Sequence, residues 1–193
     1  MNEEKTNFMD QLFTEPVYSD SPQTEDLFLK ALQEELIFHY EHNDMYRQFC
    51  NRKGFDPHAE LNDIKQIPPV AVSVFKNLGY GLASVPKEDI KLRLQSSATS
   101  GTPSTIVVDK ITSKRQAKAM VKVMQEFIGK DRKPFLVMDI DPRSEFRSLL
   151  GARFAAITGY LNFASKSGFF LKAKNGVSYF DIDAIKGAPV KAA

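Results

Sequence analysis

Apolar positions recur with a helical period through the first fifty residues of the chain. Residues 21–42 place apolar side chains at spacings of three and four behind Ser21, which suits an N-cap, and this pattern predicts one long helix. A second helix is expected over residues 43–53, with Gly54 as its left-handed terminator. Residues 1–20 predict a short helix and a turn. The amino-terminal region is therefore predicted to be helical.

The pattern changes after residue 66. Two prolines at 68 and 69 exclude a helix interior, and Val70–Phe75 is rich in β-branched and aromatic residues, so an extended segment is expected there. Farther on, Ile90–Leu94 alternates apolar with basic positions, which predicts a half-buried strand. Ile106–Val108 predicts a second strand. A polar loop joins the two.

The remaining third of the chain predicts alternating helix and strand. Ser113 suits the N-cap of a helix that continues to about residue 128, and residues 134–140 form a short apolar run typical of a buried strand. One or two helices are expected around Gly151. A final hairpin is expected about Asn175–Gly176.

These elements together predict an α/β chain with two regions. An acidic helical segment over residues 1–66 is expected to pack on an α/β portion, residues 67–193, that holds a mixed sheet with flanking helices. Charge divides similarly, because residues 1–46 carry a net charge of −9 and residues 47–193 carry +11. This asymmetry suits an anionic ligand, a nucleic acid, or the packing of the two segments on each other.

Composition excludes several classes of protein. The chain has 193 residues, of which 42% are hydrophobic, and no apolar run approaches the roughly 20 residues that span a bilayer. Residues 1–5 are polar where a signal peptide needs an apolar core. Cys50 is the single cysteine, so neither an intramolecular disulfide nor a cysteine-based zinc site can form. We therefore expect a cytoplasmic protein.

The segment between the two predicted strands is the strongest candidate site. Seven of the ten positions in Ser96–Thr105 carry hydroxyl groups, and Gly101 lets the backbone approach a ligand closely. Such a loop can donate hydrogen bonds to a polyphosphate. It is not a Walker A loop, because it has no lysine and a strand follows it. The alternative is a solvated turn, since serine and glycine are common in turns.

Other polar residues carry weaker signals. Asp139 and Asp141 could hold Mg²⁺, but a role at a strand end or helix cap is the more common one. His39 and His42 share a helix face without enough further ligands to complete a metal site. Several basic residues lack the aromatic neighbours typical of nucleic-acid binding, which favours a solvated rim: Lys130, Arg132, Lys133, Arg143 and Arg147.

Four ordered segments of the chain carry a resemblance: Pro68–Lys76, Ser96–Gly101 in the hydroxyl-rich loop, Ile111–Ser113 and Gly151–Ala156. Together they resemble the LuxE family of acyl-protein synthetases, within the adenylate-forming ligase superfamily. The likeness runs from about Leu27 to the end of the chain.

The resemblance implies a two-step reaction. A fatty-acid carboxylate attacks the α-phosphorus of ATP in the presence of Mg²⁺, giving an acyl-adenylate and pyrophosphate, and the acyl group then moves to a protein thiol. The loop would hold the β- and γ-phosphates of ATP, mostly through positioning and charge stabilisation. Its expected cofactor-binding residues are Ser96, Ser97, Thr99, Ser100, Gly101 and Thr102. The resemblance also implies the bioluminescence setting of the family and an acyl-CoA or fatty-acid reductase as partner.

Two departures from the family pattern limit these expectations. Ala98 stands where the family usually has glycine, and family members are longer than this chain. We therefore expect an amino-terminal portion that lacks the adenine contacts and the acyl-accepting cysteine, and that shows little adenylate formation alone. Cys50 does not match that acceptor. The alternative is a non-catalytic relative that acts as a binding or docking module for a reductase.

Overall fold

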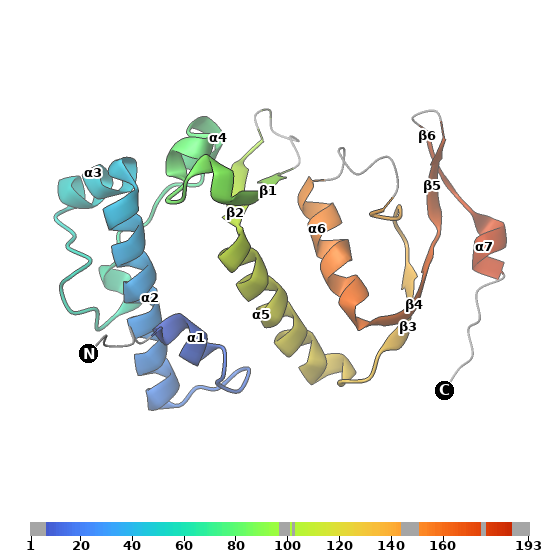
Figure 1. Cartoon of the computed structure of the whole chain (residues 1–193), viewed down its shortest axis with the longest axis horizontal. Helices are drawn as coiled ribbons and strands as arrows, with labels where there is room; N and C mark the ends of the chain where they lie inside the picture. Colours follow the sequence, from blue (N-terminus) through green and yellow to red (C-terminus); the bar gives the residue numbers. More distant parts are fainter. Residues whose placement is uncertain (1–6, 97–100, 102, 144–150, 175–176, 187–193) are drawn as a thin grey trace. The chain divides into compact units, whose positions relative to one another are not determined.

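A computed structural model of the chain describes residues 7–96, 101, 103–143, 151–174 and 177–186 (Figure 1). Contacts between Cα atoms divide the chain into two compact units, residues 1–119 and 120–193. Each unit is described by itself below. The division between residues 66 and 67 stays a prediction.

The first unit contains most of the helices. They are α1 (Phe8–Leu12), α2 (Pro22–His42), α3 (Asp44–Lys53), α4 (Ser73–Asn77) and the first half of α5 (Lys110–Ile128). Three short 3₁₀ helices, η1 (Ile64–Gln66), η2 (Gly79–Leu82) and η3 (Lys87–Asp89), lie in the connections. The two strands of this unit are β1 (Ile90–Gln95) and β2 (Thr105–Asp109).

Local sequence signals explain where α2 and α3 begin and end. The Ser21 hydroxyl accepts a hydrogen bond from the backbone N–H of Thr24 at 3.2 Å, which confirms the predicted cap of α2. Asn43 ends α2 and caps α3 through a 2.9 Å bond from the N–H of Tyr46 to its Oδ1. Gly54 follows α3 with φ of 65°, the left-handed conformation expected of it.

The predicted strand–loop–strand unit is confirmed. β1 and β2 pair antiparallel with Gln95 opposite Thr105, and side chains of β1 alternate between half-buried and exposed. Two expectations near it were wrong. Val72–Phe75 enters α4 rather than an extended segment, and α5 begins at Lys110, because the Asp109 carboxylate rather than Ser113 supplies the cap, accepting from the N–H of Thr112 at 2.7 Å.

The second unit holds the end of α5 and the remaining elements. They are β3 (Lys133–Val137), α6 (Gly151–Tyr160), η5 (Leu161–Phe163), β4 (Ala164–Phe169), β5 (Leu171–Lys174), β6 (Val177–Phe180) and α7 (Ile182–Lys186). β3 and β4 pair in parallel, with α6 in the connection between them, whereas β5 and β6 form the predicted antiparallel hairpin. The turn residues 175–176 lie outside the described residues.

The sequence interpretation of β3 and β4 was incomplete. Residues 134–140 were expected to form a buried strand, yet Leu136 is 53% exposed and only alternate positions of β3 are half-buried. Among the described residues, β3 pairs with β4 alone. β4 itself was not predicted, because Ala164–Gly168 consists of small and polar residues with low strand propensity.

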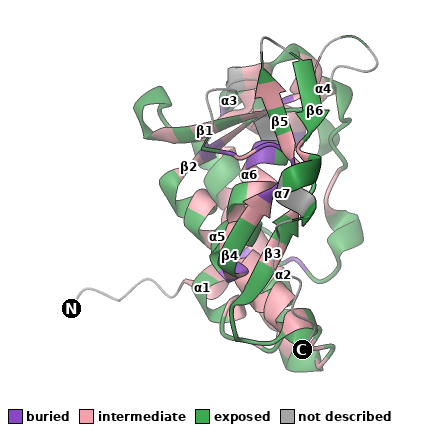
Figure 2. Ribbon diagram, turned by 90° about the vertical axis from the view of Figure 1, so that its right-hand side faces the viewer, coloured by how far each residue is buried: buried purple, intermediate pink, exposed green. Residues whose placement is uncertain are grey.

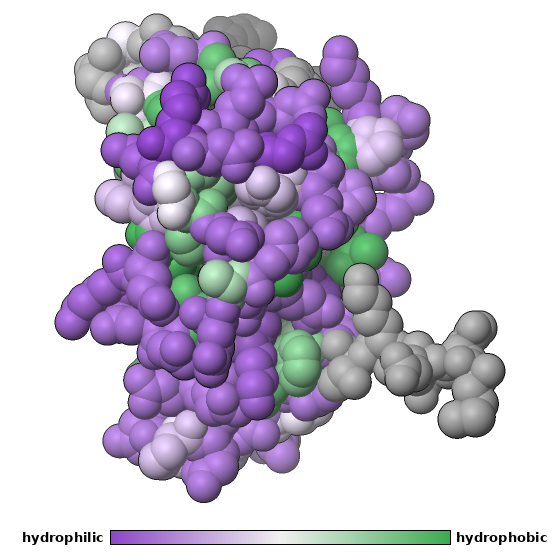
Figure 3. Space-filling view, turned by 90° about the vertical axis from the view of Figure 1, so that its left-hand side faces the viewer, coloured by the Kyte–Doolittle hydropathy of each residue, from purple (hydrophilic) through white to green (hydrophobic). Residues whose placement is uncertain are grey.

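Each unit has a small core of its own (Figure 2). Ala31, Leu36 and Cys50 are buried in the first unit, while Phe154 and Phe170 are buried in the second. Hydrophilic residues cover most of the face on the α2 side, with hydrophobic ones gathered in patches between them (Figure 3). No helix among the described residues is long and apolar enough to cross a membrane.

Candidate functional site

The hydroxyl-rich loop is held at its base by the β1–β2 hairpin. The backbone N–H of Ser96 donates to the carbonyl oxygen of Ser104 at 3.1 Å, and the N–H of Ser104 donates back to the Ser96 hydroxyl at 2.9 Å. These two bonds extend the ladder one step beyond the pair Gln95 and Thr105. The loop therefore begins and ends at a hydrogen-bonded hairpin end.

Gly101 has a backbone conformation that requires glycine. Its φ is 103°, in the region that residues with a Cβ rarely adopt, although a Cβ there would meet no atom within 4 Å. The requirement is thus one of backbone strain rather than of space. Of the six predicted phosphate-binding residues, Ser96 and Gly101 are described. The other four lie outside the described residues: Ser97, Thr99, Ser100 and Thr102. Their assignment stays a prediction.

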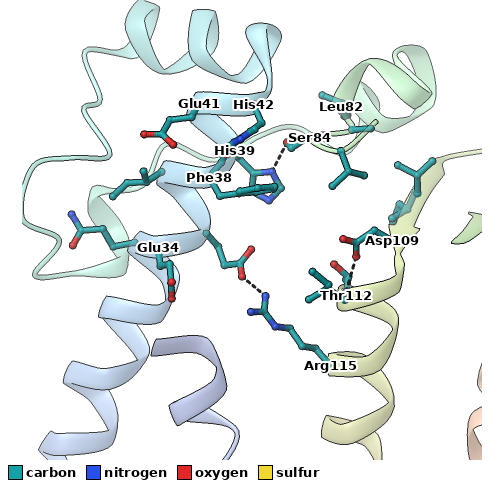
Figure 4. Close-up of a pocket in the computed structure, with 18 of the residues that line it drawn as sticks. Glu34, Phe38, His39, Glu41, His42, Leu82, Ser84, Asp109, Thr112 and Arg115 are labelled. Atoms are coloured by element: carbon teal, nitrogen blue, oxygen red, sulfur yellow. Dashed lines mark hydrogen bonds and ion pairs between the residues drawn. The ribbon is translucent and has the colours of Figure 1, made fainter. Parts of the chain in front are cut away.

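A cavity of about 1200 Å³ lies directly beside the base of this loop, within the first unit (Figure 4). One wall is a face of α2 from Lys30 to His42, and the other is formed by β2 and the first turns of α5. Segment 79–85 closes one side. Thr105, the first residue of β2 after the loop, belongs to the lining and is buried. The candidate site is therefore a hydroxyl-rich loop next to a large cavity.

An ion pair bridges the two walls of the cavity. Arg115 of α5 places Nη1 at 2.5 Å from Oε1 of Glu35 on α2 (Figure 4). Its Nε lies 3.8 Å from the carboxylate of Asp10. Both acidic residues belong to the acidic segment 1–46. The packing of the acidic segment on the basic one, which was one of the three explanations for the charge asymmetry, thus has a direct structural basis.

His39 lies on the same wall, and its ring is engaged with a hydroxyl group. Its Nδ1 is 2.6 Å from the Ser84 hydroxyl, while Nδ1 of His42 is 2.8 Å from the carbonyl of Phe38. Withdrawal of the imidazole from bulk water lowers the pKa of His39, against the opposing effect of Glu35, so the ring is neutral at pH 7. Among the described residues, no group of three or more His, Cys, Asp or Glu could hold a metal ion.

The aspartates after β3 are engaged with arginines in the second unit. Asp139 contacts Nε of Arg153 at 3.1 Å, and Asp141 accepts two side-chain bonds from Arg143 and one from its backbone N–H. Hydrogen bonding from Arg143 lowers the pKa of Asp141. Both carboxylates thus form ion pairs just beyond the end of β3.

Cys50 is fully buried, and burial raises the pKa of its thiol despite a hydrogen bond with Tyr46. Burial likewise raises the pKa of Tyr46. A thiol that is both inaccessible and protonated is a poor nucleophile, which agrees with the expectation that Cys50 does not accept acyl groups.

Comparison with known proteins decides the family. The family model described as acyl-protein synthetase, LuxE, matches residues 4–186. The chain belongs to the LuxE family. Two long-chain-fatty-acid–luciferin-component ligases are similar to parts of it. The one from Vibrio harveyi is 36% identical over 78 residues, and the one from Aliivibrio fischeri is 35% identical over 86 residues.

These matches cover limited shares of each protein. They span 40% and 45% of this LuxE chain but only 20% and 22% of the two ligases. Among solved structures, an open conformation of 2-hydroxyisobutyryl-CoA ligase in complex with 2-HIB-AMP and CoA has a TM-score of 0.62 at 18% identity, over 80% of this chain and 33% of that one. This likeness confirms the predicted α/β fold.

Sequence reasoning found the loop but missed the cavity. Glu35 and Arg115 are 80 residues apart, and no local signal in the sequence joins them. The same holds for His39 and Ser84, which are 45 residues apart. The charge asymmetry was the one feature of the sequence that pointed toward contact between these segments.

Proposed function

We propose that this LuxE chain provides the phosphate-binding portion of an ATP-dependent ligase that activates a fatty acid as an acyl-adenylate for transfer to a protein thiol. The observation that carries the proposal is the position of the hydroxyl-rich loop at the end of a closed antiparallel hairpin, in a chain of this family. The names of the two related ligases support a long-chain fatty acid as the substrate.

The task of the loop would be positioning and charge stabilisation. Hydrogen bonds join Ser96 and Ser104 at the base of the loop. Gly101 has a φ of 103°, and we propose that N–H groups and hydroxyls of the loop face one anion when it is bound. Donors fixed before the reaction need no reorganisation as charge develops on the phosphates of ATP.

Mg²⁺ would come to this site with the nucleotide. The carboxylates considered for it, Asp139 and Asp141, are already paired with arginines, and we derive no step through the ion. A fatty-acid or acyl-CoA reductase that consumes the activated acyl group is part of the same proposal, as is a cytoplasmic location.

Nucleotide binding tests the assignment of the loop. Thr99→Ala and Ser100→Ala each remove a donor to a charged oxygen, worth about 1.5–3 kcal/mol, so ATP affinity measured by calorimetry should fall roughly ten- to a hundred-fold. Ser178→Ala, which removes an exposed hydroxyl on β6, is the matched control and should leave affinity unchanged. Unaltered ATP affinity in both loop variants, with unaltered melting, would show that the loop is a solvated turn.

The proposal also predicts the activity of this chain by itself. The segments that match this chain cover only 20% and 22% of the two related ligases. We therefore expect little fatty-acid-dependent exchange between ATP and labelled pyrophosphate from residues 1–193 alone. Robust exchange would contradict this expectation. The absence of both ATP binding and exchange would favour the non-catalytic docking module instead.

A further inference from the structure

A second, smaller pocket lies within the first unit, between α1 and the first turns of α5, and we call it the α1–α5 pocket. Its volume of about 240 Å³ equals that of about eight water molecules in the liquid, so it has room for a group the size of a phosphate. Its lining consists of Asp10, Phe13, Ile111, Lys114, Arg115 and Lys118. Four of these six residues do not line the larger cavity beside the loop.

Positive charge predominates around the α1–α5 pocket. Three of the six lining residues are basic and Asp10 is the one acid among them, which gives the lining a net charge of +2. The three bases lie at positions 114, 115 and 118 of α5, and this helix has no acidic residue before Glu126. Neither lysine therefore has an acid within one turn of its own helix, and a bound anion would relieve the repulsion among the three cations.

The two lysines of the pocket have no carboxylate partner among the described residues. Lys114 forms neither a hydrogen bond nor an ion pair with any of them. The ammonium group of Lys118 lies 5.4 Å from the ring centroid of Phe13, which places the charge over an aromatic face. That contact leaves the N–H donors of Lys118 without an oxygen acceptor. Both ammonium groups can thus serve a ligand without first breaking an ion pair.

Arg115 has a donor that Asp10 serves poorly. Nη1 of Arg115 binds Glu35, but its Nε is buried and has no hydrogen-bond acceptor among the described residues. The Asp10 carboxylate lies 3.8 Å from Nε, beyond hydrogen-bond distance, and the Asp10 side chain is 66% exposed. A buried donor without an acceptor is costly. An oxyanion that displaced this exposed carboxylate would supply the missing acceptor.

We infer that the α1–α5 pocket binds a phosphate dianion, either free or as the terminal group of a phosphate monoester, and that the bound group displaces the Asp10 carboxylate. Lys114, Arg115 and Lys118 supply the cations. The guanidinium group suits phosphate oxygens in geometry, and the ammonium groups add charge. A phosphate group has nearly two negative charges at pH 8, which matches the net charge of the lining better than a carboxylate does. This site is separate from the hydroxyl-rich loop and does not rest on the proposed function.

Nuclear magnetic resonance can locate the bound anion. At pH 8 and constant low ionic strength, inorganic phosphate should shift the backbone amides of Asp10–Phe13 and Ile111–Lys118 saturably, with a Kd of about 1 mM or below. Glycerol 3-phosphate should shift the same amides. Tighter binding of this monoester would identify a monoester as the ligand, and equal binding would identify the free anion. Absence of saturable shifts with both phosphates, or equal shifts with acetate, would overturn the inference.

Charge variants test which residues hold the anion. Lys114→Gln and Lys118→Gln should each weaken phosphate binding about five- to tenfold, because each removes a unit charge beside a dianion. Lys53→Gln, at an exposed position on α3 outside the lining, is the matched control and should change affinity by less than about twofold. Equal losses in all three variants would show a general effect of net charge and would overturn the site.

Asp10→Asn tests the displacement of the carboxylate. This change removes the one acid of the lining, so phosphate affinity should rise about fivefold. An unchanged or lower affinity would mean that Asp10 does not compete with the anion. Because Asp10 is exposed, the variant leaves the core of the unit unchanged, and its melting temperature provides the check on folding.

A loop variant separates this site from the phosphate-binding loop. Phosphate binding that Thr99→Ala leaves unchanged and that Lys114→Gln weakens would support the α1–α5 pocket, whether or not the chain binds ATP. Phosphate binding that Thr99→Ala abolishes and that Lys114→Gln leaves unchanged would reject the pocket. That second result would uphold the loop of the proposed function.

Discussion

Replacement of Asn43 should destabilise the first unit more than replacement of an exposed asparagine would. Asn43 is 4% exposed and joins three elements. Its Nδ2 donates to the carbonyls of Gly81 at 3.0 Å and Ala83 at 2.9 Å. Its Oδ1 accepts from the backbone N–H of Tyr46 in the first turn of α3. The side chain thereby fixes segment 79–85, which closes one side of the cavity.

The magnitude follows from these three bonds. Asn43→Ala removes an N-cap, worth about 1 kcal/mol, and leaves two carbonyls without their donor, at about 1 kcal/mol or more each. We expect a loss of about 3 kcal/mol in the free energy of unfolding, or roughly 6–12 °C in Tm for a chain of this length. Urea unfolding followed by circular dichroism measures the loss, and exposed Asn62→Ala should change it by less than about 0.5 kcal/mol.

Asn43→Asp isolates the contribution of the donor. The carboxylate keeps the acceptor for α3 but turns an oxygen toward the carbonyls of Gly81 and Ala83, so burial and repulsion should raise its pKa in the folded state. The folded state then binds the proton more tightly than the unfolded state does. Stability relative to wild type should therefore be greatest at low pH and should fall as pH rises.

Two outcomes would refute this reasoning. A loss below about 1 kcal/mol in Asn43→Ala would mean that water replaces the amide without cost. A deficit in Asn43→Asp that stays constant between pH 4 and pH 8 would mean that the carboxyl does not face the two carbonyls.

Three further predictions concern single sites. Cys50→Ser should leave fatty-acid labelling unchanged, and the native Cys50 thiol should react with a thiol reagent only on unfolding; rapid native labelling would contradict its burial. The lowered pKa of Asp141 predicts stability that is present above its usual pKa and lost as pH falls, so Asp141→Asn should flatten the acid limb of a Tm–pH curve. Gly159→Ala would place a Cβ 2.6 Å from Sδ of Met120, so the flexible methionine must shift, whereas alanine gains about 1 kcal/mol of helix propensity; we expect a net change within about 1 kcal/mol in urea unfolding, and a loss above about 2 kcal/mol would show that Met120 cannot move aside.

Elements with strong local signals could be predicted from the sequence. The cap at Ser21, the terminator at Gly54 and the alternation over Ile90–Leu94 each act within a few residues, and each was confirmed. Predictions failed where local preference conflicted with context. Val72–Phe75 has β-branched and aromatic residues but forms part of a short helix, and the small polar residues of β4 form a strand because β3 supplies the partner.

The candidate site shows the same difference between local signals and contacts between distant segments. The loop Ser96–Ser104 could be found because its chemistry is concentrated in one stretch of sequence. The cavity could not, because its walls come from segments that lie as far apart in the sequence as Phe8 and Arg115. Charge asymmetry alone indicated attraction between the two segments, without indicating which residues meet.

The short helix α1 is held chiefly by groups outside itself. The amides of Phe8 and Met9 donate to one carboxylate oxygen of Glu34, and α1 has no buried residue. Its amide protons should therefore exchange with solvent through local opening, well before those of α2. Because Phe8 lines the cavity, each such opening would widen the route to the interior while α2 stays folded. The opening rate of α1, which hydrogen exchange reports directly only when every opening leads to exchange, would thus set an upper bound on how fast a ligand enters from that side.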